Sequence, residues 1–213
     1  FDSNYPAKQE IVENWKVQDK YWDISKEELR LKIPDGIDQE SYITFRRNIT
    51  DYSIYNGEIT DAVSADIMLA FNVIATGEKG GISILLEEDE KTYEVFIRSR
   101  GEKKASHIKI SGSIVDSNAN AFIEPDKTSR IEFSNADNEI ILKLNNSVVF
   151  SHTYNTDLSS LEGYTKSSKL KFGGINTEAV FKNISIFRDV YYTESGEWGT
   201  YNPVEIDKKE YFF

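Results

Sequence analysis

The segment from 131 to 152 constrains the fold more than any other part of the chain. It holds three short runs rich in β-branched and aromatic residues, separated by polar residues at 135–138 and 145–147. Asn and Asp favour turns because they tolerate the left-handed backbone region and bond their own backbone. The segment therefore predicts an antiparallel meander with one apolar face, which needs a second sheet to cover it.

The second turn of this meander decides which side chains face one another. With a three-residue loop, Leu144 faces Val148 and Leu142 faces Phe150. A two-residue loop would pair Leu144 with Ser147 instead. Because a one-residue slip turns every side chain to the other face of the sheet, we expect the three-residue loop.

Alternating apolar residues predict strands along most of the chain, about a dozen in all at roughly 8–12-residue spacing. They lie at 29–33, 42–45, 67–73, 82–86, 93–97, 108–114, 170–172 and 180–190, with a strand or short hairpin at 15–24 and a polar connection at 51–61. This spacing is typical of an all-β sandwich. We predict a two-sheet antiparallel jelly-roll sandwich over 15–193, with a lead-in arm at 1–14 and an extended arm at 194–213.

Composition excludes several classes of partner. The 213 residues are 39% hydrophobic and 13% aromatic, which is enough for a real core, and contain no cysteine for disulfides. A net charge of −11 disfavours nonspecific nucleic-acid binding and docking on anionic lipid, both of which need a basic surface. No apolar run approaches the roughly 18 residues of a membrane span. We find no signal peptide, and we expect the chain to be a piece of a longer protein.

Metal-binding patterns are weak. His107 and His152 lie far apart without an acidic partner at ligand spacing, so both are interpreted as strand histidines satisfied by solvent or backbone. Asn135–Asn138 could offer oxygen ligands to calcium, but turn chemistry explains these residues, and Asp61 and Asp66 are interpreted as structural. We predict no catalytic residue, no metal ligand and no cofactor site within the chain.

Two acidic strings remain. Residues 87–90 are predicted to form a solvated hairpin tip, which protects a sheet against edge pairing. Glu205, Asp207 and Glu210 spell E-x-D-x-x-E, a string similar to one on a cleft strand of jelly-roll glycoside hydrolases, where two carboxylates act as nucleophile and acid. Here 208–209 are lysines, where such a strand expects apolar residues.

The two ends of the chain resemble bacterial signal peptidase I. The strings are R-D-V-Y-Y-T at 188–193 and E-Y-F-F at 210–213, which look like the external part of that family. The opening residues 1–8, with Trp15 and Trp22, are similar to the entry of a large insertion in planctomycete- and lentisphaera-like members. That insertion resembles a concanavalin A-like or laminin-G-like jelly roll.

The resemblance implies a membrane-bound serine endopeptidase that removes signal peptides with a Ser–Lys dyad. The serine and lysine motifs would lie outside this chain, so the fragment would be noncatalytic, a binding or shielding module. The resemblance also implies an extracytoplasmic, periplasmic location, membrane contact only through parent segments, and secreted preproteins as partners of the parent protease.

Two alternatives come from other classes. The first is a noncatalytic carbohydrate-binding or adhesion module of lectin-like fold with a glycan or protein ligand, for which Trp198 and Tyr201 are candidates to stack on sugars. The second is a jelly-roll glycoside hydrolase that uses Glu205, Asp207 and Glu210.

Overall fold

The computed structural model describes residues 14–17, 19–25, 28–34, 37, 39–46, 49–55, 58–63, 66–155 and 168–188, with the backbone alone described at 50–55, 58–63 and 188. The strands are β1 (Trp15–Val17), β2 (Trp22–Ile24), β3 (Leu29–Lys32), β4 (Glu40–Phe45), β5 (Thr50–Tyr55), β6 (Glu58–Val63), β7 (Ile67–Thr76), β8 (Gly81–Glu88), β9 (Lys91–Arg98), β10 (Ser106–Ile110), β11 (Ser113–Asn118), β12 (Thr128–Ala136), β13 (Glu139–Leu144), β14 (Ser147–Thr153), β15 (Ser168–Ile175) and β16 (Glu178–Arg188). In the described ranges, no helix is long and apolar enough to cross a membrane.

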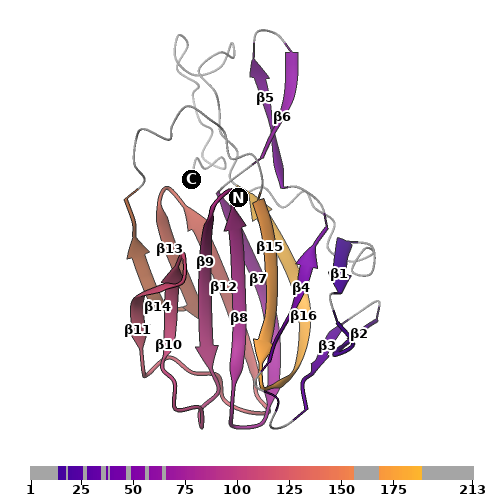
Figure 1. Cartoon of the computed structure of the whole chain (residues 1–213), viewed down its shortest axis with the longest axis vertical. Helices are drawn as coiled ribbons and strands as arrows, with labels where there is room; N and C mark the ends of the chain where they lie inside the picture. Colours follow the sequence, from indigo (N-terminus) through magenta and orange to yellow (C-terminus); the bar gives the residue numbers. More distant parts are fainter. Residues whose placement is uncertain are drawn as a thin grey trace, which may run out of the picture.

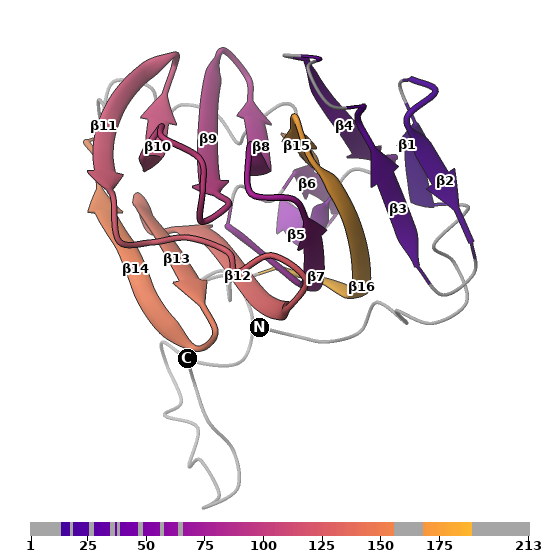
Figure 2. The same ribbon diagram turned by 90° about the horizontal axis from the view of Figure 1, so that it is seen from below.

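The strands form two seven-stranded antiparallel sheets that face each other (Figures 1 and 2). The front sheet of Figure 1 has the order β1-β4-β15-β8-β9-β10-β11, and the back sheet has the order β14-β13-β12-β7-β16-β3-β2. The predicted all-β, two-sheet antiparallel sandwich is therefore confirmed. β5 and β6 pair with each other as antiparallel strands, so the polar connection predicted at 51–61 is wrong.

The core lies between the two sheets and is richest around one aromatic ring. Phe172 of the front sheet lies 4.9 Å from Trp15, 5.1 Å from Phe71 and 5.0 Å from Phe181, measured between ring centroids. Phe71 and Phe181 belong to the back sheet, so this cluster joins the two layers. Large aromatic side chains contribute strongly because each buries a large apolar area.

The turns of the β12–β14 meander fall where the Asn and Asp residues predicted them. Asp137 and Asn138 have φ angles of 50° and 62°, and Asn145 and Asn146 have φ angles of 50° and 66°. Two consecutive left-handed residues define the type I′ turn, whose twist matches that of the flanking strands. Both connections are therefore two-residue loops.

The three-residue loop expected for the second hairpin is wrong, although part of the register that it predicted is present. Leu142 pairs with Phe150 as predicted, but Leu144 pairs with Ser147 rather than with Val148. A bulge next to Leu142 adds one residue to β14 and restores the inward alternation beyond it. Val148, which was expected on the apolar face, is 57% exposed.

The segment 15–24 contributes to both layers. Trp15 of β1 pairs with Phe45 in the front sheet, whereas Trp22 of β2 pairs with Leu31 in the back sheet. Two strands are therefore present, but they do not form the hairpin that was one of the two predicted arrangements. The chain crosses from one layer to the other within a few residues, so both tryptophans point into the same core.

Candidate functional site

The outward side of the front sheet carries the candidate site. On β8 the side chains of Ile82, Ile84 and Leu86 point into the core, and the alternate positions point away from it because successive side chains of a strand face opposite sides. The strand registers align these outward positions in two rows. We call the ten residues the outer face: Tyr42, Gly173, Ser83, Phe96 and His107 in one row, and Thr44, Lys171, Leu85, Glu94 and Lys109 in the other.

Several side chains of the outer face are buried although they lie outside the core. Ser83, Phe96 and His107 are 0%, 2% and 1% exposed. The ring centroids of Phe96 and His107 are 5.3 Å apart. Ser83, Phe96 and His107 therefore form a second packed layer outside the core, which helps to fix the polar side chains beside them.

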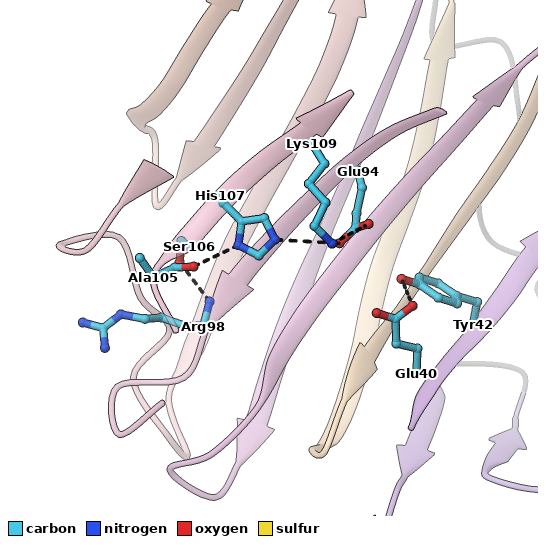
Figure 3. Close-up of polar contacts among 8 residues, drawn as sticks. All are labelled: Glu40, Tyr42, Glu94, Arg98, Ala105, Ser106, His107 and Lys109. Carbon is cyan, nitrogen blue, oxygen red and sulfur yellow. Dashed lines mark hydrogen bonds and ion pairs between the residues drawn. The ribbon is translucent and has the colours of Figure 1, made fainter. Parts of the chain in front are cut away.

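Two ion pairs flank Leu85 on this layer. The Lys109 Nζ donates to both carboxylate oxygens of Glu94, at 2.9 and 3.1 Å (Figure 3). The Lys171 Nζ donates to Glu87 Oε1 at 2.5 Å. The four side chains are between 16% and 30% exposed, so each pair is partly withdrawn from water and still reachable from it.

His107 has one ring nitrogen satisfied and one unsatisfied. Nδ1 lies 2.9 Å from the carbonyl oxygen of Ala105 (Figure 3), and because a carbonyl only accepts, Nδ1 carries the hydrogen. Burial, together with Lys104 and Lys109, lowers the pKa of His107 against the opposing effect of Glu94 and the Ala105 carbonyl. The ring is therefore neutral at pH 7, and Nε2, buried and without a hydrogen-bond partner, is an acceptor.

The loop that supplies the Ala105 carbonyl is itself fixed. The Arg98 guanidinium donates to the carbonyl oxygens of Glu102 and Ala119, both at 2.6 Å. The backbone N–H of Arg98 also donates to the Ser106 hydroxyl at 2.9 Å (Figure 3). Arg98 thereby binds the middle of the loop at Glu102 and the residue that follows it, Ser106, and the loop orients the imidazole of His107.

Tyr42 supplies the aromatic end of the outer face. Its hydroxyl donates to Glu40 Oε2 at 3.2 Å (Figure 3). Burial raises the pKa of Tyr42, and the charges of Glu40 and Glu94 raise it further, so the phenol stays protonated. A side chain at the neighbouring Gly173 would place its Cβ 1.9 Å from the Ser41 carbonyl oxygen, so glycine is required there.

The acidic hairpin tip differs from its prediction. Glu88 continues the inward alternation of β8, and its carboxylate accepts a hydrogen bond from Asn135 Nδ2 at 3.2 Å. Burial, with a contribution from Asp66, raises the pKa of Glu88 to about 7. The prediction of a solvated tip is therefore wrong for Glu88, whereas Asp89 and Glu90 are exposed in the turn.

The Asn/Asp segment considered for calcium has other roles. The Asn135 amide joins Glu88 to Tyr154, whose hydroxyl donates to Asn135 Oδ1 at 2.8 Å. Asp66, which is 7% exposed, accepts from the Asp137 N–H at 3.3 Å. Among the residues that the structure describes, no three His, Asp or Glu side chains gather as metal ligands would.

The remaining sequence candidates are scattered or undescribed. His152 lies on β14, at the edge of the back sheet, so the two histidines do not meet. For Asp61 only the backbone is described. The other candidates, Trp198, Tyr201, Glu205, Asp207 and Glu210, lie outside the described residues.

Sequence reasoning missed most of the outer face. Tyr42, Glu94, Lys109 and Lys171 were not singled out because each is unremarkable as a residue in a half-exposed strand. The available signal was alternation: Glu94, Lys109 and Lys171 each lie between apolar residues of a predicted strand. Which outward positions are neighbours depends on strand order and register, which the pattern of one strand does not contain.

The comparisons with known proteins bear on the fold. The sequence matches no protein-family model and no curated protein. The structure is similar to the carbohydrate-binding module CBM66 from Bacillus subtilis, with a TM-score of 0.55 and 12% identity over 81% of this chain and 94% of that one. It is also similar to a protein of unknown function with a galectin-like fold from Bacillus subtilis, with a TM-score of 0.56 and 12% identity over 88% and 95% of the two chains.

A third similar structure is a sialidase, with a TM-score of 0.50 and 12% identity over 82% of this chain and 17% of the sialidase. At this identity the likenesses show the fold alone, a galectin-like jelly-roll sandwich. They add nothing in support of the resemblance to signal peptidase I, whose strings at 188–193 and 210–213 lie almost wholly outside the described residues.

Proposed function

We propose that the chain is a noncatalytic carbohydrate-binding module and that the outer face of the front sheet is its ligand surface. The observation that carries this proposal is the fixed set of hydrogen-bonding groups on that face: the Glu94–Lys109 pair, the Lys171–Glu87 pair and the orphan Nε2 of His107. Saccharides present many hydroxyl groups, each a donor and an acceptor. Groups that are already ordered bind such ligands at a smaller entropic cost.

The chemistry of the outer face favours binding over hydrolysis. A glycosidase pairs two carboxyl groups, one that donates a proton to the leaving group and one that acts as nucleophile or base. On the outer face, Glu94 is bound to Lys109, and the adjoining Glu87 is bound to Lys171. Tyr42 is kept neutral by its surroundings. These groups offer contacts to a ligand rather than a free acid and base.

The likeness in fold to a carbohydrate-binding module and to a protein with a galectin-like fold supports the proposal. The resemblance to signal peptidase I, with its periplasmic location, stays a prediction. The two do not conflict, because a module inserted into a membrane protease could present the same face.

The test compares matched carboxylate variants on the two sheets. Glu94→Gln removes the charge that orders Lys109 on the outer face. The control, Glu132→Gln, makes the same change on the outward side of the back sheet, where Glu132 lies 3.5 Å from Arg130 and 4.0 Å from Lys143. Binding is screened on a glycan array and measured by titration calorimetry, with thermal unfolding as the check on folding.

We expect the wild type and Glu132→Gln to bind the same saccharide equally, and Glu94→Gln to bind it at least tenfold more weakly. A folded wild-type chain that binds no saccharide would contradict the proposal. Equal weakening by both substitutions would place the ligand surface elsewhere.

A further inference from the structure

The unsatisfied nitrogen of His107 restricts the chemistry of the ligand. Nε2 is an acceptor, since the hydrogen of the neutral ring is on Nδ1, where it is donated to the Ala105 carbonyl. The His107 side chain is only 2% exposed, and Nε2 has no hydrogen-bond partner. A buried polar atom without a partner is disfavoured, so a ligand group that reaches this atom and donates to it gains affinity.

The carboxylate of Glu94, which lies next to Nε2, cannot donate a hydrogen bond to it. Glu94 Oε1 lies 3.9 Å from Nε2 (Figure 3), and an ionised carboxylate is also only an acceptor. A second anion, such as the carboxylate of a uronic acid or a sulfate, would add a further acceptor beside these two. A hydroxyl group can donate to Nε2, so this position accepts a hydroxyl and rejects an acidic substituent.

The cations around this position are already occupied. Lys109 donates to both oxygens of Glu94, and Lys171 is paired with Glu87. The Lys104 Nζ lies 5.4 Å from the ring centroid of Phe96, and the Arg98 guanidinium is bound by backbone carbonyls. An anionic sugar would have to break one of these arrangements to gain a counter-ion.

We infer that the ligand is an uncharged saccharide and that one of its hydroxyl groups donates a hydrogen bond to Nε2 of His107. This inference rests on the proposed function and narrows it to a class of sugar. Because Nε2 is buried, a neighbouring side chain must move to admit the hydroxyl, and Lys109, on the same side of β10 as His107, has a long stem with several rotatable bonds. It moves aside when the hydroxyl enters and keeps its contact with Glu94.

The test combines a ligand comparison with two variants of one residue. Neutral oligosaccharides are compared with oligosaccharides that carry uronic acids, sialic acid or sulfate. The acidic sugars are included because the exposed Lys16 extends the second row of the outer face at the edge strand and offers them a cation. His107→Phe keeps a ring against Phe96 and removes the acceptor. His107→Gln places an amide oxygen near Nε2, and His152→Gln is the control on the back sheet.

We expect neutral saccharides to bind, His107→Phe to weaken binding at least tenfold, His107→Gln to weaken it less, and His152→Gln to leave it unchanged. Preference for acidic sugars, or full affinity in folded His107→Phe, would overturn the inference and leave the proposed function intact. Binding of no saccharide at all by the folded wild type would instead remove the proposed function.

Discussion

Replacing Glu88 by Gln should make the protein more stable at neutral pH. Burial raises the pKa of Glu88 from its ordinary 4.5 to about 7, so the folded protein holds a proton that the unfolded chain releases. The contribution of Glu88 to stability is then greatest below pH 4.5, falls as the pH rises from 4.5 to 7, and levels off above that. This difference between the pKa values of Glu88 in the folded and unfolded states corresponds to a loss of about 3 kcal/mol of unfolding free energy by pH 8.

The Gln variant avoids this loss because its side chain has the same shape and no charge to desolvate. Its amide oxygen can still accept the hydrogen bond from Asn135. We expect Glu88→Gln to be about 3 kcal/mol more stable than the wild type at pH 8 and equal to it near pH 4. Urea unfolding followed by the fluorescence of the buried Trp15 and Trp22 measures this difference.

The neighbouring carboxylate gives a matched control. Glu87 points outward and is paired with Lys171, so Glu87→Gln should destabilise the protein, by about 1 kcal/mol or less. The reasoning about Glu88 would be refuted if Glu88→Gln were no more stable than the wild type at pH 8. It would also be refuted if the gain were the same at pH 4, since the effect would then not come from ionisation.

Three further outcomes follow from the structure. Saccharide binding should weaken as the pH falls below 6.5, the ordinary pKa of an imidazole, because protonation of His107 turns Nε2 into a donor toward Glu94. Calorimetry at pH 7.5 and 5 tests this, and undiminished binding at pH 5 would contradict it. Phe172→Ala should cost about 3–5 kcal/mol of unfolding free energy because it empties the centre of the aromatic cluster, and urea unfolding should show a loss well above 1 kcal/mol. Asn146→Ala should cost about 1 kcal/mol because the φ of 66° strains an alanine, whereas Asn146→Gly should be nearly neutral in the same assay.

The layers of this fold were predictable from the sequence because alternation is a local property. Each inward run, such as Ile82, Ile84 and Leu86, shows its period within a few residues. The same rule extended by one step would have turned Glu88 inward, but its acidic neighbours suggested a solvated turn instead. Burial of a carboxylate depends on a partner such as Asn135, which lies 47 residues away along the chain.

Register was less predictable because a bulge leaves no local mark. Val148 and Val149 are equally apolar, so the sequence does not say which of them faces inward. The two-residue turn and the bulge together satisfy both demands: Asn145 and Asn146 take the left-handed positions, and Phe150 still reaches the core. The β5–β6 pair was missed because polar residues outnumber the few alternating apolar ones, such as Tyr52 and Ile54 in β5.

The two sides of each strand have different roles, so the features that set the fold differ from those that would set a ligand. The inward residues of β8, β9 and β10 build the core, and the outward residues of the same strands build the outer face. A substitution on one side leaves the packing of the other largely intact, so sandwiches that share 12% identity can keep the fold and change every outward group. For the proposed binding module, the choice of ligand therefore depends on which outward groups lack a hydrogen-bond partner, and on the outer face we assign that role to Nε2 of His107.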